Sequence, residues 1–218
     1  MDYLNARKGL KTILLGEALA GLGVLLGFAM SLVVYFPEAR GNLDVLSATI
    51  IVALVAAGLT IVGFIVTLFG LNIAGKDETY FESAFWVSIL TVVLKIGSSL
   101  LSYFVPSQQL LYSSFDAIGD VCSVVIMVLI INGISIVLEK IEAYDLSDRG
   151  RPLSMAFIAI YIVSIILGFL PSFFKNPGPE IYYALRAFES LSALVEAVVY
   201  ILFIIYVYKA IKRLKKNK

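Results

Sequence analysis

The chain has 218 residues, of which 60% are hydrophobic and only 15% charged, with a formal net charge of +1. Soluble domains use about 45–50% apolar and about 25% charged residues, so this composition excludes an ordinary soluble domain and indicates an integral membrane protein. The single cysteine excludes an internal disulfide, and the lack of histidine excludes the usual histidine-based metal sites and catalysis.

The predicted elements are long apolar helices. Uncharged stretches cover residues 18–37, 45–75, 121–138 and 152–174, each at or beyond the length of about 18 residues that indicates a spanning helix. Two further stretches carry internal charges: 83–104 contains Lys95, and 188–208 contains Glu189 and Glu196. The sequence therefore predicts an all-α integral membrane protein with six transmembrane helices in a single transmembrane domain, residues 1–218.

Basic residues predict the orientation. Most of the 17 Lys and Arg residues lie before the first span, in the second and fourth connections, or after the last span. The positive-inside rule then places both termini in the cytoplasm, and we expect a multi-pass protein of the bacterial cytoplasmic membrane. The first run resembles a signal peptide but is too long and contains Glu17, so we expect it to be retained.

The basic tail, residues 209–218, predicts contact with anionic lipid headgroups. Nucleic acid is a poor alternative partner, because no soluble domain accompanies these charges. The sequence does not indicate an oligomeric state.

A threefold internal repeat organises the chain. The phrases "LDVLSA" at 43–48, "FDAIGD" at 115–120 and "FESLSA" at 188–193 follow three similar outer connections. They predict three tandem helical hairpins of parallel orientation, residues 10–75, 83–143 and 154–213, related by a pseudo-threefold axis along the membrane normal.

Small residues predict close packing in the first hairpin, because they let two helix backbones approach each other. They follow one stripe of the first span and recur in the second, at Gly16, Ala20, Gly23, Gly27 and Ser31 and at Ala56, Ala57, Gly58, Gly63 and Gly70.

The repeat also divides the charged residues of the spans into those that recur in every unit and those that do not. Asp44, Asp116 and Glu189 recur in all three units, and we expect them in the first turn of their helices, where the helix dipole favours a carboxylate. Lys95, Asp120, Glu196 and Glu17 break the repeat, which makes them the candidates for function.

Lys95 lies near the midpoint of its span, where a charge costs at least about 2.5–3.5 kcal/mol unless it is paired or wetted. We expect Glu196 or, failing that, Asp120 as its partner. Two interpretations remain open. The pair fixes the register of the helices, or Lys95, Asp120 and Glu196 line a polar pocket between the third, fourth and sixth spans that opens outward.

Three secondary candidates are Glu17, Asp116 and Tyr200. We expect Glu17 to pair with Lys11 or to reach the interface. Asp116 and Asp120 are one turn apart, but no further acidic ligand is near them in sequence, so no metal site is predicted.

Motifs of enzymes and cofactors are absent: the chain has no Gly-rich phosphate loop, zinc motif or nucleophile elbow. We therefore predict a non-enzymatic protein without a cofactor that binds or transports a small solute or ion. The alternative is an accessory or scaffold protein that acts through partner or lipid contacts.

Two segments, "GLNIAGKDETYFESAF" (70–85) and "VLEKIEAYDLSDRGR" (137–151), resemble segments of uncharacterised multi-pass membrane proteins from Gram-positive bacteria. The resemblance covers about the middle third of the chain and implies no activity. Mitochondrial carriers are similar in having three two-span repeats, but their proline-acid-basic signature is missing here.

Overall fold

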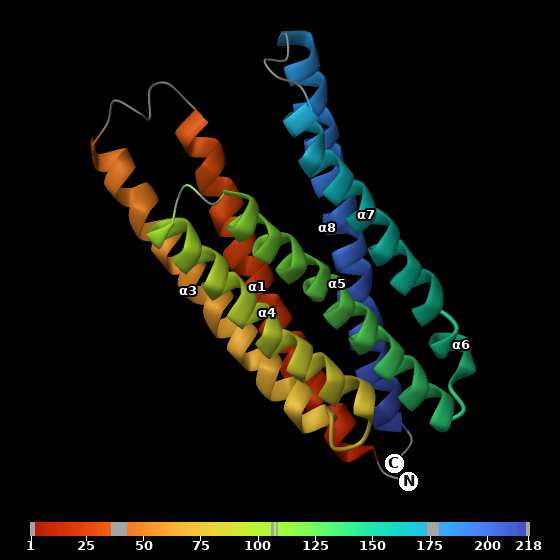
Figure 1. Ribbon diagram of the computed structural model, residues 1–218. Coiled ribbons are helices and arrows are strands. Elements are labelled where there is room, and N and C mark those ends of the chain that lie inside the picture. Colours follow the sequence, from red (N-terminus) through yellow and green to blue (C-terminus); the bar gives the residue numbers. More distant parts are fainter. Residues whose placement is uncertain (1–2, 36–42, 106, 108, 174–178, 217–218) are drawn as a thin grey trace.

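The computed structural model describes residues 3–35, 43–105, 107, 109–173 and 179–216. These residues form helices and no strand. In chain order the helices are α1 (Leu4–Tyr35), α3 (Leu43–Ala74), α4 (Thr79–Phe104), α5 (Gln109–Lys140), the short α6 (Tyr144–Ser147), α7 (Gly150–Phe173) and α8 (Pro179–Lys216). Figure 1 shows them as a tilted bundle.

Among the described residues, five stretches are long and apolar enough to cross a membrane. They are Leu4–Met30, Val45–Ala74, Thr79–Phe104, Leu111–Lys140 and Leu194–Lys215. The one long helix without such a stretch among its described residues is α7, which corresponds to the predicted fifth span, residues 152–174; much of α7 beyond Ser164 lies outside the described side chains. The all-helical membrane class is thus supported, whereas the count of six remains a prediction.

Consecutive long helices pack in pairs. α1 lies along α3, α4 along α5 and α7 along α8 (Figure 1). These pairs coincide with the ranges of the predicted hairpins, but their threefold relation remains a prediction. Leu4 of α1 and Lys216 of α8 lie at the same end of the bundle, which we call the terminal end; the opposite end is the loop end.

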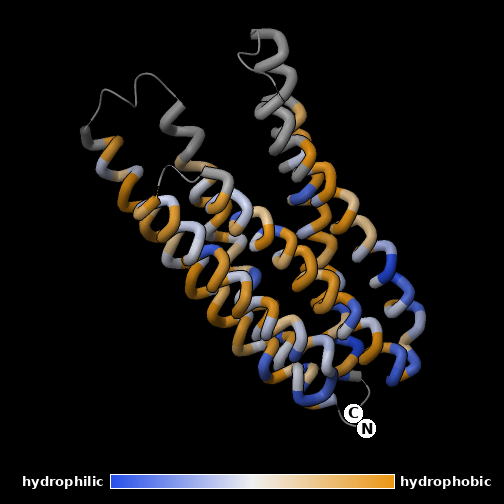
Figure 2. The backbone as a smooth tube through the Cα atoms, viewed as in Figure 1, coloured by the Kyte–Doolittle hydropathy of each residue, from blue (hydrophilic) through white to orange (hydrophobic). Residues whose placement is uncertain are grey.

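The buried core is concentrated toward the terminal end. Among the side chains that the structure describes, the core extends toward the loop end on α5, α7 and α8 as far as Ile126, Ile160 and Val199. Its fully buried side chains include Leu10, Ile13, Leu71, Phe81, Ile130, Ile134, Leu138, Phe203 and Val207. Hydrophilic residues also gather at this end, outside the core (Figure 2).

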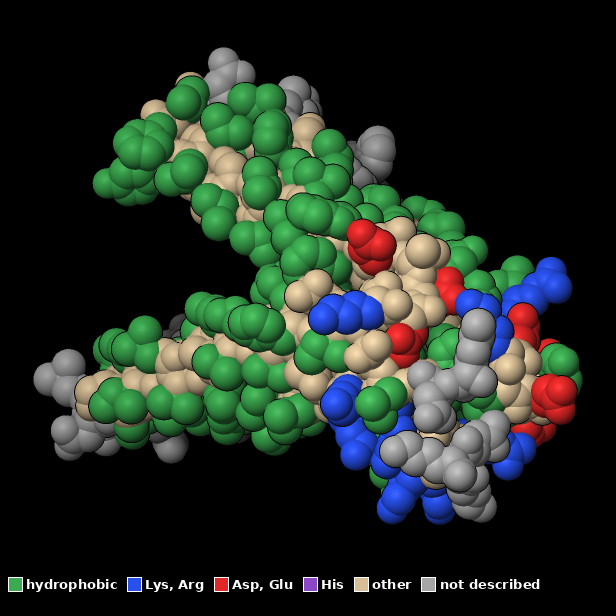
Figure 3. Space-filling model, turned by 90° about the horizontal axis from the view of Figure 1, so that it is seen from below, with side chains coloured by type: hydrophobic (Ala, Val, Ile, Leu, Met, Phe, Trp, Pro, Cys, Tyr) green, Lys and Arg blue, Asp and Glu red, His purple; other side chains and the backbone are tan. Residues whose placement is uncertain are grey.

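Beyond this core the helices separate into two arms. One arm contains α1, α3 and α4 and the other α7 and α8, while α5 runs from the first arm to the second (Figure 1). Seen from below, hydrophobic side chains form two lobes with a wedge between them, and charged side chains gather where the lobes join (Figure 3).

Glycines determine how closely α1 and α3 approach. Gly9 and Gly16 of α1 face Gly70 and Gly63 of α3, so a Cβ added at Gly16 would lie 2.6 Å from the Gly63 carbonyl oxygen. Similarly, a Cβ added at Gly23 would lie 2.6 Å from the Ala56 carbonyl oxygen. The predicted close packing of this hairpin is therefore confirmed over this part of the interface.

The predicted close packing is wrong at Gly27 of the first-span stripe and at Gly58 of the second span, where an added Cβ would meet open space. In contrast, an added Cβ at the neighbouring Gly23 or Gly63 would meet the backbone of the partner helix. The side chain of Ser31 lies outside the described residues.

The expected first-turn positions of Asp116 and Glu189 are also wrong. α5 begins at Gln109 and α8 at Pro179, about two turns or more before these acidic residues. Both helices thus begin on the N-terminal side of the apolar stretches from which their first residues were predicted. Asp44 does lie in the first turn of α3.

Polar contacts join the hairpins at the terminal end. The Asp77 carboxylate accepts hydrogen bonds from the Asn5 side chain at 2.9 Å and from the Ala6 N–H at 2.7 Å, which satisfies a free donor in the first turn of α1. Lys140 donates to Glu78 at 2.7 Å, joining the end of α5 to the start of α4.

Candidate functional site

Lys95 of α4 forms an ion pair with Asp120 of α5. The structure thus selects one of the two predicted partners, and the preferred partner Glu196 is not the one in contact. The Lys95 and Asp120 side chains are 44% and 47% exposed. The pair is therefore accessible from outside the packed core, unlike a fully buried ion pair that only fixes helix register.

A glycine gives Lys95 room to reach Asp120. A Cβ added at Gly119 of α5 would lie 3.2 Å from Lys95 Cε and 3.5 Å from its Cδ. The lysine stem therefore crosses the helix surface at Gly119 before its ammonium meets the next residue. In the sequence, Gly119 directly precedes Asp120, which indicates a position where a side chain from another helix can approach closely. The sequence does not indicate that this side chain is Lys95.

Glu196 of α8 has a different partner. Its carboxylate accepts a hydrogen bond from Ser164 of α7, and the Ser164 hydroxyl is 2.8 Å from that of Ser192. This chain of hydroxyls supplies donors to Glu196 but no positive charge. Sequence reasoning missed Ser164 and Ser192, since serines in an apolar helix are also common at ordinary packing positions.

Tyr161 of α7 lies within electrostatic range of both Asp120 and Glu196. The three predicted pocket residues are thus brought to one region. We call Lys95, Asp120, Tyr161 and Glu196 the polar cluster.

The depth of the polar cluster follows from the extent of the core. On α7 the core reaches Ile160, directly before Tyr161, and on α8 it reaches Val199, about one turn from Glu196. On α5 the core reaches Ile126, less than two turns from Asp120. The cluster therefore lies directly above the last core layer, where the arms begin to separate.

Glu17 belongs to a second polar group, in which three helices meet. Its carboxylate accepts hydrogen bonds from Tyr200 of α8 and, at 3.2 Å, from Thr67 of α3. The predicted pairing with Lys11 is wrong, because Glu17 faces α3 and α8 instead. Two secondary candidates, Glu17 and Tyr200, are therefore direct partners, whereas Asp116 is not part of this contact.

Among the described residues, no group of three or more His, Cys, Asp or Glu side chains could hold a metal ion. The comparisons with known proteins returned no matching family model, no matching curated protein and no matching solved structure. The polar cluster places one ammonium, two carboxylates and a phenol hydroxyl above an apolar core, with the hydroxyls of Ser164 and Ser192 beside Glu196.

Proposed function

We propose that this protein binds a small cation or an amine-bearing solute at the polar cluster, as a solute-binding or transport protein of the bacterial cytoplasmic membrane. The observation that supports it most is the unequal pairing of the two carboxylates. Asp120 is neutralised by Lys95, whereas the polar partners of Glu196 among the described side chains are hydroxyls. An ionised Glu196 would attract a positive charge, and an ammonium or alkali cation would satisfy it.

The fold and the charge distribution together support an outward orientation of the proposed pocket. The basic residues that predict a cytoplasmic side occupy the terminal end, and the arms separate toward the loop end. With six spans and both termini in the cytoplasm, the wedge opens outward. Water entering it would reach the polar cluster without crossing the core.

The test is thiol accessibility in a Cys122→Ser background. In Ser192→Cys, the new thiol lies beside the Ser164 hydroxyl that contacts Glu196, and an impermeant thiol reagent applied outside intact cells should modify it. Ser88→Cys is the control, because Ser88 is only 1% exposed. Failure to modify Ser192→Cys, or modification only from the cytoplasmic side, would refute the outward pocket.

Charge selectivity tests the ligand class. A cationic thiol reagent should modify Ser192→Cys faster than an anionic reagent of similar size, and Glu196→Gln should reduce that ratio several-fold. Sodium, potassium or small alkylamines should slow the reaction in the parent but not in the Glu196→Gln variant. A ratio unaffected by Glu196→Gln would contradict a cation site.

The accessory role has different consequences. If a partner helix fills the wedge, the Ser192→Cys thiol is protected in native membranes and becomes reactive only after purification. Equal reactivity before and after purification favours the solute site.

A further inference from the structure

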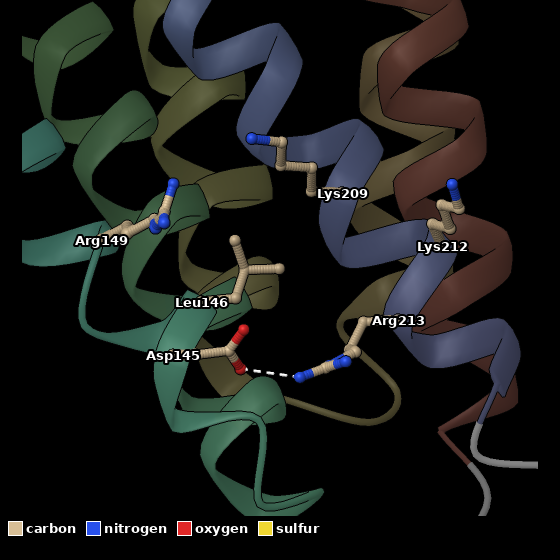
Figure 4. A pocket seen from close by; sticks show the side chains of 6 residues that line it. All are labelled: Asp145, Leu146, Arg149, Lys209, Lys212 and Arg213. Carbon is tan, nitrogen blue, oxygen red and sulfur yellow. Dashed lines mark hydrogen bonds and ion pairs between the residues drawn. The ribbon is translucent and has the colours of Figure 1, made fainter.

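The terminal end contains a second site, remote from the polar cluster. It is an open pocket of about 250 Å³ between α6, the start of α7 and the end of α8, lined by Asp145, Leu146, Arg149, Lys209, Lys212 and Arg213. In Figure 4, Arg149 and Lys209 extend into the space between the helices, and Lys212 stands on the flank of α8. We call it the cationic pocket.

The charge of the cationic pocket is unbalanced. Arg213 donates to Asp145 at 2.8 Å; of the carboxylates in the described part of the chain, none pairs with Arg149, Lys209 or Lys212. Four basic side chains thus surround one acidic one. Two guanidinium groups in such a cluster are suited to a phosphate, whose oxygens accept their planar pairs of N–H donors.

The apolar surface beside the pocket indicates where the phosphate comes from. Lys209 is near the end of the apolar stretch Leu194–Lys215, and the exposed side chains of Ile205 and Ile201 lie one and two turns away on the same face of α8. A phospholipid with its headgroup in the pocket could therefore lay an acyl chain along this stripe, which a soluble phosphate would leave uncovered.

We propose that the cationic pocket is a binding site for the phosphate headgroup of an anionic phospholipid. The basic tail by itself predicts only diffuse attraction to a charged membrane surface. The cationic pocket differs from the tail in its residues, because it includes Arg149, which lies across from α8, and does not include the tail residue Lys215. It is independent of the proposed solute site.

Native mass spectrometry of the full-length protein in detergent tests the proposal. Titration with phosphatidylglycerol should yield a complex with one bound lipid, formed more readily than with phosphatidylcholine. Arg149→Gln with Lys209→Gln should weaken phosphatidylglycerol binding by about 25-fold, at roughly fivefold per charge. Asp145→Asn should strengthen it, because the one carboxylate among the described lining residues is lost.

The matched control is Lys76→Gln with Lys215→Gln, which removes the same charge from exposed positions outside the pocket. Equal weakening by both double variants would overturn the pocket, since diffuse attraction explains that result. Binding of inorganic phosphate as strong as that of phosphatidylglycerol would overturn the lipid source. Unchanged unfolding temperatures of the lipid-free variants would show that lost binding is not lost folding.

Discussion

The energetic role of Lys95 depends on Asp120, because removing one member of a pair leaves the other charge without compensation. Lys95→Leu should lower the free energy of unfolding. Loss of an exposed ion pair costs at most about 1 kcal/mol, and removal of one partner of a fully buried pair costs about 3–5 kcal/mol. We expect a value between these two. The intermediate value follows from the partial exposure of both side chains. Unfolding of the purified protein in mixed micelles by sodium dodecyl sulfate measures it.

Double variants identify the partner. Lys95→Leu with Asp120→Leu should recover most of the loss, because neither charge then remains unpaired. Lys95→Leu with Glu196→Leu is the matched control and should recover none of it. Recovery in the control alone would show that Glu196 is the partner in the membrane.

The backbone conformation of Glu142, directly after α5, leads to a second prediction at the residue scale. Glu142 has φ 59°, the Ala143 N–H bonds to the Leu138 carbonyl at 2.9 Å and the Glu142 N–H to the Glu139 carbonyl at 2.8 Å. This is the Schellman pattern, in which the left-handed position usually belongs to glycine.

Glu142→Gly should therefore stabilise the protein by up to about 1 kcal/mol, through relief of the left-handed strain less the entropy of a more flexible unfolded chain. Glu142→Ala should give no such gain, because alanine keeps the Cβ. Equal gains in both variants would mean that loss of the charge, and not the backbone conformation, is responsible.

Residue-level reasoning located the charges of the site but not their pairing. The cost of a charge in lipid depends on depth, which position within an apolar run indicates; Lys95, Asp120 and Glu196 could therefore be selected from the sequence. Which partner meets Lys95 depends on how α4 and α5 face each other and on the space above Gly119. Spacing along separate helices does not determine either.

At the scale of the element, the interface of α1 and α3 gives the sharpest test. Gly16→Ala should destabilise by about 1–3 kcal/mol, because its Cβ must displace the backbone of α3. Gly27→Ala and Gly58→Ala enter open space and should be neutral or stabilising, since alanine is the better helix former by about 0.5–1 kcal/mol. Thermal unfolding in detergent compares them; equal loss in all three variants would contradict the described interface.

Element boundaries show what the sequence could and could not predict. Apolar runs identify where a helix is solvated by lipid, and they correctly located the five stretches that, among the described residues, are long and apolar enough to cross a membrane. They do not show where the helix begins, because helical hydrogen bonds continue into water. For this reason α5 and α8 start well before Asp116 and Glu189.

At the scale of the whole molecule, separation of the arms could not be predicted from hydrophobicity. Lipid is about as apolar as a neighbouring helix, so an apolar face does not reveal which of the two it contacts. The concentration of core residues toward the terminal end and the wedge in Figure 3 are properties of packing. The proposed outward pocket depends on both.

The threefold repeat belongs to this scale as well. If it is real, residues 10–75, 83–143 and 154–213 should superpose by rotations of one sense about an axis near the membrane normal in an experimental structure. Rotations of mixed sense, or an axis in the membrane plane, would show that the recurring acidic phrases have another origin.

A high-resolution cryo-electron microscopy map of the full-length protein in a lipid nanodisc tests the central claim most directly, because the polar cluster must be reached by water from the loop end. The account predicts density for ordered water or a solute within hydrogen-bonding distance of Lys95, Asp120 or Glu196. Acyl-chain density filling the wedge down to the cluster, or arms closed over it with no solvent, would contradict the proposed site.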